Sequence, residues 1–226
     1  MEVVYEDNHI IIVNKRPGEI VQGDKTGDTP LVETVRQYIK ETYAKPGNVF
    51  CGLVHRIDRP VGGLVVFAKT SKALTRMNEL FRLGDVHKTY WAIVQGRPKQ
   101  PEAHLTHYIT SVERNNKSYA SLRPKEGASR SELIYRTLAE GENYTLLEID
   151  LITGRKHQIR VQLSTTGTPI KGDLKYGARR SNPDGSISLL ARSIRFIHPV
   201  SKKEIYVEAP IPDDKLWQSL ADMIQS

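Results

Sequence analysis

The chain has 226 residues, of which 38% are hydrophobic and 26% charged, a composition typical of one large or two small globular domains. A single cysteine excludes an internal disulfide, the Cys and His residues lack zinc-site spacing, and no apolar run approaches the roughly 20 residues of a membrane span. The N-terminus has no secretory pattern, so we expect a soluble protein of the reducing cytoplasm, and the net charge of +7 favours an anionic partner.

The first third of the chain predicts a mixture of strands and helices. Residues 3–15 contain two apolar runs around an Asp-Asn turn and predict two short strands. A helix is predicted from Thr29, whose hydroxyl can cap a first turn that begins with Pro30. The apolar run of residues 64–68 predicts a buried strand, and Ser71 is expected to cap a second helix after it.

The middle of the chain predicts further strands on either side of a polar region. Residues 89–95 predict a strand, whereas residues 100–130 are poor in apolar side chains, so we expect little core there. Within that region, residues 114–117 predict an exposed hairpin tip or a mobile loop. Strands are predicted again over residues 131–138 and 144–152, the second with apolar and acidic side chains in alternation.

The last third predicts two helices around a pair of strands. A short helix is expected over residues 153–163, strands over 187–196 and 204–208, and a final helix over 213–224. Because strands outnumber helices and lie in adjacent runs, we predict an α+β fold with a mixed, largely antiparallel sheet. Neither a repeat nor a low-complexity linker interrupts the sequence, so we expect one domain over residues 1–226.

Asp58 is the first candidate for chemistry. It lies between Arg56 and Arg59, just before a proline and a Gly-Gly pair that predict a turn. A carboxylate beside guanidinium groups stays ionised well below neutral pH, so it could act as a nucleophile or a base. The alternative is an exposed loop with a solvated ion pair, which is the commoner outcome for an isolated Arg-x-Asp-Arg sequence.

Residues 151–180 form a basic segment that carries six of the seven net positive charges. One acid, Asp173, stands in it against seven basic residues: Arg155, Lys156, Arg160, Lys171, Lys175, Arg179 and Arg180. A solvated helix face usually mixes both signs, so this one-sided charge predicts a surface that follows a phosphate backbone. Helical spacing places Lys156, His157 and Arg160 on one face, and Arg160 lies between apolar neighbours, so it should be partly buried and need an anion from protein or ligand.

Linked motifs along the chain resemble a known family. Residues 55–70 read His-Arg-Ile-Asp-Arg-Pro and then Gly-Leu-Val-Val-Phe-Ala-Lys-Thr, and residues 88–90 read Lys-Thr-Tyr. Residues 154–160 read Gly-Arg-Lys-His-Gln-Ile-Arg, and residues 169–177 read Pro-Ile-Lys-Gly-Asp-Leu-Lys-Tyr-Gly. In this order and spacing they closely resemble the RNA pseudouridine synthases of the RluA type, typified by ribosomal large subunit enzyme A.

The resemblance implies roles for four residues. Asp58 would be the catalytic carboxylate that attacks or deprotonates the uridine nucleotide, and Arg160 its ion-pair partner. Tyr90 would stack on the uracil and is a candidate to take the proton from carbon 5. Arg56 would occupy the space that a flipped-out nucleotide leaves. Whether Asp58 attacks the sugar, attacks the base or acts as a base is left open.

The resemblance also implies the fold, the partner and the absence of a cofactor. The pseudouridine synthase fold is a bifurcated mixed sheet flanked by helices around a basic cleft. The expected protein is a monomer that binds ribosomal or transfer RNA and uses no cofactor and no metal. Nine residues are expected to contact the RNA besides Arg56: His55, Arg59, Arg155, Lys156, His157, Lys171, Lys175, Arg179 and Arg180.

Some features depart from the family pattern, and two other functions stay open. Val61-Gly62 replaces a usual Thr-Ser, residues 189–191 read Leu-Leu-Ala where Leu-His-Ala is common, and we expect no separate N-terminal RNA-binding domain. One alternative is an RNA-binding or chaperone protein of the same fold without turnover, although Asp58, Tyr90 and Arg160 are all present. The other is a carboxylate hydrolase, which needs two cooperating acids where the sequence offers only Asp58.

Overall fold

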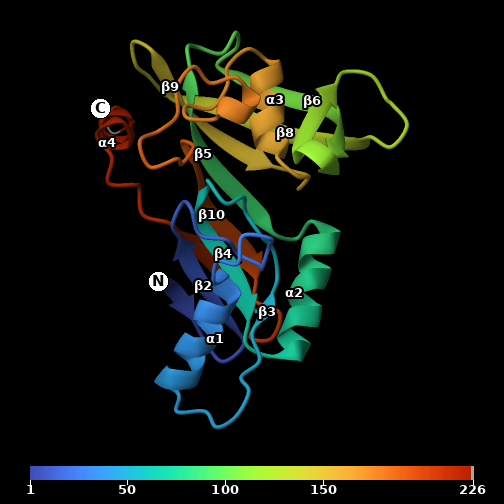
Figure 1. The fold of residues 1–226 in the computed structure, drawn as a ribbon, viewed down its shortest axis with the longest axis vertical. Helices are drawn as coiled ribbons and strands as arrows, with labels where there is room; N and C mark the ends of the chain where they lie inside the picture. Colours follow the sequence, from blue (N-terminus) through green and yellow to red (C-terminus); the bar gives the residue numbers. More distant parts are fainter. Residues whose placement is uncertain (225–226) are drawn as a thin grey trace. The chain divides into compact units, whose positions relative to one another are not determined.

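The computed structural model describes residues 1–224, which form two compact units (Figure 1). The first unit contains residues 1–87 and 191–210, and the second contains residues 88–190 and the C-terminal segment from residue 211. The chain therefore crosses between the units three times, which is why no linker marks a boundary in the sequence. The single domain predicted over the whole chain stays a prediction, and its last two residues lie outside the described part.

The first unit contains mostly antiparallel strands and two helices. Its elements are β1 (Glu2–Glu6), β2 (Ile10–Lys15), α1 (Leu31–Thr42), β3 (Gly52–Leu53), β4 (Gly62–Ala68), α2 (Ser71–Leu83), β10 (Leu189–Ile197, from Ala191) and β11 (Glu204–Glu208). The strands lie in the order β1-β2-β4-β10, with β3 paired to β4 and β11 paired to β10. Helix α2 packs against β3 and β4 (Figure 1).

The core of the first unit is built on β2 and β4. Every residue of β4 is buried, and so are Ile10 to Val13 of β2. The predicted helical stripe of α1 is confirmed, because Leu31, Val35 and Ile39 all point into this core. Burying an aliphatic side chain of this size contributes about 1.5–3 kcal/mol, so these two strands and one helix face account for much of the unit's stability.

Both helix caps predicted in the first unit are displaced by one residue. Pro30, not Thr29, occupies the N-cap position of α1, and no side chain caps the helix there. At α2 the cap is Thr70, whose Oγ1 accepts a hydrogen bond from the backbone N–H of Ala73 at 3.1 Å, and Ser71 is the first helical residue. Two adjacent hydroxyl residues are equivalent candidates in a sequence, and the backbone conformation decides between them.

The second unit contributes the remaining strands, which pair antiparallel to one another. Its elements are β5 (His87–Gln95, from Lys88), β6 (Glu102–Val112), the 3₁₀ turn η1 (Glu113–Asn115), β7 (Lys117–Ser121), β8 (Ser129–Glu140), β9 (Tyr144–Leu151), α3 (Gln158–Thr165), η2 (Leu174–Tyr176) and α4 (Lys215–Asp222). The strands lie in the order β5-β9-β8-β6-β7. Strands outnumber helices in both units, which confirms the predicted α+β class.

Residues 100–130 contain more regular structure than the sequence predicts. They form β6 and β7, a hairpin whose tip at η1 turns through Asn116 in a left-handed conformation, so the predicted hairpin tip is confirmed. The expectation of little core is wrong in part, because His107, Ile109 and Ser118 are all buried. Two of these three side chains are polar and are held by hydrogen bonds, so hydrophobic patterning could not reveal them.

No helix within residues 1–224 is both long enough and apolar enough to span a membrane.

Candidate functional site

Asp58 lies in a tight turn of the first unit, within residues 55–61, here called the Asp58 loop. Its carbonyl oxygen accepts a hydrogen bond from the backbone N–H of Val61 at 3.0 Å, and its side chain is half-buried. The predicted turn is therefore confirmed, although the two glycines assigned to it belong to β4. Gly63 has φ +111°, and a Cβ there would lie 2.6 Å from the backbone nitrogen of Ala191 in β10, so only glycine fits this approach.

His55 attaches the start of the Asp58 loop to the rest of the unit. Its Nε2 accepts a hydrogen bond from the backbone N–H of Val66 in β4 at 3.1 Å. Its ring stacks on Phe81 of α2 with a centroid distance of 5.0 Å. These contacts give His55 a structural position, whereas the next residue, Arg56, is exposed. The RNA contacts predicted for both residues stay predictions.

Lys15 holds the other end of the Asp58 loop, and the sequence analysis missed it. Its Nζ, at the end of β2, donates hydrogen bonds to the carbonyl oxygens of Val61 at 2.7 Å, Arg16 at 2.9 Å and Arg59 at 3.1 Å. The side chain is only 1% exposed, which is unusual for a lysine. A lysine that ends a strand beginning with four consecutive apolar residues is the signal that could have identified it.

The charge on Lys15 is coupled to that of Asp58. Burial lowers the pKa of the lysine from 10.5 to about 8, while the negative charges of Glu19 and Asp58 act in the opposite direction. A buried ammonium group is stable only where acceptors replace its lost hydration. The three carbonyl groups meet that need, and because two of them, those of Arg59 and Val61, closely follow Asp58 in sequence, Lys15 fixes the backbone that carries the carboxylate.

Arg59 forms an ion pair with a residue that the sequence did not suggest. Its Nη2 lies 2.6 Å from Oδ2 of Asp28, and its Nη1 donates to Oγ1 of Thr26 at 3.4 Å. The effect expected of the two neighbouring guanidinium groups on Asp58 stays a prediction. One of the two is bound to Asp28, because an arginine side chain reaches further than sequence adjacency suggests.

Tyr90 lies on β5 in the second unit. It is 8% exposed and stands opposite Ile149 of β9 in the antiparallel register. Two residues earlier on the same strand, Lys88 has a pKa lowered by burial. Its Nζ is close to Gly154, where an added Cβ would lie 3.8 Å from it. The tyrosine of the Lys-Thr-Tyr motif is thus buried, and its lysine is half-buried.

Arg160 is buried in α3 and has an acidic partner. Its Nε donates to Oδ2 of Asp173 at 2.7 Å and its Nη2 to Oδ1 at 2.9 Å. The two side chains are 6% and 1% exposed. The expectation that Arg160 is buried and needs an anion is confirmed, and Asp173 supplies one. The pair with Asp58, a residue of the other unit, stays a prediction.

The predicted helix face that joins Lys156, His157 and Arg160 does not exist. Helix α3 begins at Gln158, and His157 precedes it with a left-handed φ of 56°, which breaks the helical spacing. Lys156 is exposed, whereas His157 is buried with its Nδ1 2.8 Å from the hydroxyl of Tyr176. The glycine that precedes this stretch suggested an earlier helix start, but the chain makes a turn there instead.

Tyr176 links the turn before α3 to the hairpin of β6 and β7. Its hydroxyl accepts a hydrogen bond from the backbone N–H of Ser118 at 2.8 Å, so its own proton is available to His157. Its ring centroid lies 5.1 Å from the guanidinium carbon of Arg160. Burial raises the pKa of this tyrosine, so it stays protonated and uncharged at neutral pH.

The basic segment leaves most of its cations at the surface. Five of its seven basic residues are exposed: Arg155, Lys156, Lys175, Arg179 and Arg180. Lys171 is half-buried and donates to Oδ1 of Asn182 at 2.6 Å. Because the one acid of the segment, Asp173, is bound to Arg160, no carboxylate of the segment neutralises the exposed cations.

Residues 1–224 contain no group of three or more His, Cys, Asp or Glu side chains placed to hold a metal ion. The single cysteine, Cys51, is buried, and burial raises its pKa to about 12, so it stays a thiol.

Comparison with known proteins identifies relatives along the whole chain. A family model described as RNA pseudouridylate synthase matches residues 9–165. The ribosomal large subunit pseudouridine synthase C of Vibrio cholerae is 33% identical over 230 residues, which cover 99% of this chain and 70% of that protein. The tRNA pseudouridine synthase C of Vibrio vulnificus is 30% identical over 246 residues, which cover 100% of this chain and 96% of that protein.

A solved structure shares the fold. Human RNA pseudouridylate synthase domain containing 4 superposes with a TM-score of 0.80 at 22% identity, over 99% of this chain and 93% of that one. At this level of identity the likeness concerns the arrangement of strands and helices. It confirms the fold that the sequence motifs predict.

Proposed function

Because the chain belongs to the RNA pseudouridylate synthase family, we propose that it converts a uridine of ribosomal or transfer RNA to pseudouridine with Asp58 as the catalytic carboxylate. The enzyme class follows from the family: the protein is an isomerase that acts on RNA uridines. The observation that supports the assignment of Asp58 is the fixed position of its loop. A half-buried carboxylate stands on a turn whose backbone is fixed by the ammonium group of Lys15.

A rigid mounting matters for this reaction. The base must leave the sugar, turn and rejoin it through carbon, and the carboxylate must keep its position while the base moves. Groups that are held in place before the reaction lower its barrier, because no reorganisation is needed in the transition state. Lys15 would hold Asp58 in place in this way, through two hydrogen bonds to the Asp58 loop and a third to the adjacent residue Arg16.

Tyr90 and Arg160 are proposed to act with Asp58. Tyr90 would stack on the uracil and accept the proton from carbon 5, and its burial on β5 supports the stacking role. Arg160 would orient the carboxylate of Asp58, and its pair with Asp173 holds the guanidinium group in one orientation. Arg56 is exposed, which suits the proposed insertion into the space of the flipped nucleotide.

RNA binding is assigned to the exposed cations of the basic segment. Arg155, Lys156, Lys175, Arg179 and Arg180 would contact phosphates, which supply most of the affinity and little of the sequence preference. Ribosomal and transfer RNA are the substrates named for the relatives, and we propose the same classes here. These substrates and the buried thiol of Cys51 support a cytoplasmic protein.

The experiment uses unmodified transcripts of ribosomal and transfer RNA, without added metal or nucleotide. We expect the parent protein to produce pseudouridine, detected by mass spectrometry of nucleosides, and Asp58→Asn to reduce the rate by at least about a hundredfold. Asp85→Asn, a change at an exposed aspartate of the same unit, should leave the rate unchanged. Turnover by Asp58→Asn near the parent rate would remove Asp58 from the chemistry, and no product from the parent would favour a non-catalytic RNA-binding protein.

A further inference from the structure

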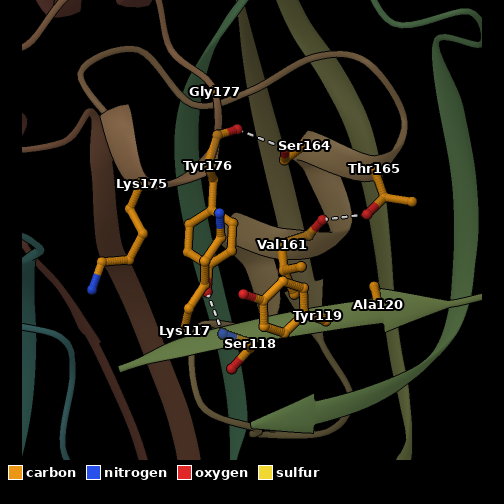
Figure 2. A pocket seen from close by; sticks show the side chains of 10 residues that line it. All are labelled: Lys117, Ser118, Tyr119, Ala120, Val161, Ser164, Thr165, Lys175, Tyr176 and Gly177. Atoms are coloured by element: carbon orange, nitrogen blue, oxygen red, sulfur yellow. Dashed lines mark hydrogen bonds between the residues drawn. The ribbon is translucent and has the colours of Figure 1, made fainter. Parts of the chain in front are cut away.

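A pocket in the second unit lies between the hairpin of β6 and β7 and the helix α3 (Figure 2). One wall is β7, from Lys117 to Ala120, and the others are α3 and the η2 turn. Its volume is about 360 Å³. This lies within the range of roughly 300–1,000 Å³ that is usual for small-molecule sites, so the pocket can hold a group of the size of a nucleobase with its sugar.

An exposed aromatic ring stands at this pocket. Tyr119 is 47% exposed, and its hydroxyl accepts a hydrogen bond from Nδ2 of Asn115 at 2.9 Å, which fixes the orientation of the ring. Ordered aromatic rings on a strand are the platforms on which unpaired bases stack in single-strand binding proteins. A second ring, that of Tyr176, lines the same pocket from the η2 turn (Figure 2).

Two ammonium groups accompany the rings. The Nζ of Lys117 lies 5.7 Å from the ring centroid of Tyr119 and 5.5 Å from that of Tyr176. The Nζ of Lys175 donates to the carbonyl oxygen of Asn116 at 2.9 Å and so is held at the hairpin tip. Within the described chain no acidic side chain lines the pocket, so the two charges favour an anionic group there.

Two hydroxyl groups of α3 at the pocket are free to accept hydrogen bonds from a ligand, because their own protons are already donated to the backbone. Oγ of Ser164 donates its proton to the carbonyl oxygen of Tyr176 at 2.6 Å, and Oγ1 of Thr165 donates to that of Val161 at 2.8 Å (Figure 2). With their protons engaged, both oxygens can still accept hydrogen bonds. A ribose 2′-hydroxyl or the amino group of a base is a donor of the required kind.

We propose that this pocket, the Tyr119 pocket, binds one unpaired nucleotide of the RNA substrate. The base stacks on Tyr119, its phosphate lies near the ammonium groups of Lys117 and Lys175, and sugar or base donors bond to Ser164 and Thr165. The identity of the ligand as RNA rests on the proposed function. None of Asp58, Tyr90 and Arg160 lines the pocket, although the ring of Tyr176, which does, lies 5.1 Å from the guanidinium carbon of Arg160.

The test measures binding without turnover. A fluorescein-labelled 12-nucleotide oligoadenylate contains no uridine, so its affinity is independent of any synthase activity. Tyr119→Ala is expected to weaken its binding by about five- to 150-fold, the range found when a base loses its stacking partner, whereas Tyr119→Phe, which keeps the ring and loses only the bond to Asn115, should bind far more tightly than Tyr119→Ala. Lys117→Gln should lower the slope of log affinity against log salt by about 0.7.

Matched controls come from residues outside the pocket. Tyr206→Ala removes a tyrosine that is 50% exposed on β11, and Lys99→Gln removes an exposed lysine; both should bind like the parent. Melting curves of all variants verify the fold. The proposal is overturned if the parent does not bind oligoadenylate, or if the folded Tyr119→Ala protein binds it as tightly as Tyr206→Ala. Pseudouridine formation by the parent is assayed separately, so failure of the proposed function and failure of the pocket give different results.

Discussion

The guanidinium group of Arg160 and the carboxylate of Asp173 form a buried pair joined by two hydrogen bonds of 2.7 and 2.9 Å. The two residues are 13 positions apart and belong to different sequence motifs of the family pattern. Because each charge is removed from water, each depends on the other for its stability. The pair therefore connects α3 to the segment before η2, and both must be in place for Arg160 to keep its orientation.

Replacing one member of this pair should lower the free energy of unfolding of the protein. For Asp173→Asn we expect the free energy of unfolding to fall by about 3–5 kcal/mol, because an uncompensated guanidinium charge stays buried. Urea denaturation followed by circular dichroism measures it. As a control, Glu33→Gln disrupts the exposed pair between Glu33 and Arg36 and should cost about 0–1 kcal/mol. Equal stabilities of Asp173→Asn and Glu33→Gln would contradict the role of the buried pair.

Local patterns in the sequence predicted much of the fold. The buried strand β4 and the apolar stripe of α1 follow from side chains within a dozen positions, so their periodicity was enough. The β6–β7 hairpin was predicted only at its tip, because its buried positions include His107 and Ser118. A polar residue becomes a core residue through its hydrogen bonds, and those partners are distant in sequence.

The candidate site was predicted by motif more than by physical pattern. Asp58 and Arg160 were singled out from charge and neighbours, but their contacts were not. Lys15 binds carbonyl groups 44 and 46 positions away, and backbone oxygens leave no trace in a sequence. Asp173 was one of several acidic residues that could have paired with Arg160, and the tertiary structure selects among them.

The lowered pKa of Lys15 predicts that the protein becomes more stable in mild alkali. Below pH 8 the lysine is charged in both folded and unfolded chains, and the folded state bears the full cost of burying the charge. Between pH 8 and 10.5 the unfolded chain retains the proton that the folded chain has lost. The contribution of Lys15 to the free energy of unfolding should therefore rise with pH across this window, by up to about 3 kcal/mol.

The measurement compares the parent with Lys15→Met at several pH values. The difference between their free energies of unfolding should shift in favour of the parent between pH 8 and 10.5. Lys72→Met, at an exposed lysine of α2, should show a constant difference over the same range. A constant difference for Lys15→Met as well would mean that Lys15 does not titrate in this window.

His198 predicts a loss of stability in mild acid. Its Nδ1 accepts hydrogen bonds from the backbone N–H groups of Val200 at 3.1 Å and Ser201 at 2.9 Å, and its Nε2 lies 2.9 Å from Oδ2 of Asp7. Protonation of Nδ1 would remove both backbone bonds. Burial lowers the pKa of His198 below 6.5, although the nearby carboxylate of Asp7 opposes the shift.

The direction of this pH effect follows because the pKa of His198 is lower in the folded chain than in the unfolded chain. Below pH 6.5 the unfolded chain takes up a proton on His198 before the folded chain does, so stability is complete above this pH and falls below it. As the pH falls below 6.5 we expect the parent to lose stability, a loss that His198→Asn, which does not titrate, lacks. His87→Gln, at an exposed histidine, should behave like the parent. Parallel stability curves for the parent and His198→Asn would refute the assignment.

The exposed cations of the basic segment should determine how RNA binding depends on salt. Each cation that no longer neutralises a phosphate lowers the slope of log affinity against log salt by about 0.7 to 0.9, so Lys175, Arg179 and Arg180 replaced together by Gln should lower it by roughly two. Single-turnover chemistry at saturating RNA should stay near the parent rate, because Asp58 is untouched. Replacing Lys40, Lys72 and Arg76, exposed on α1 and α2, makes the same change in charge and should leave the slope unaltered. Titrations over a range of potassium concentrations measure both, and equal slopes for the two triple variants would show that the RNA does not follow the basic segment.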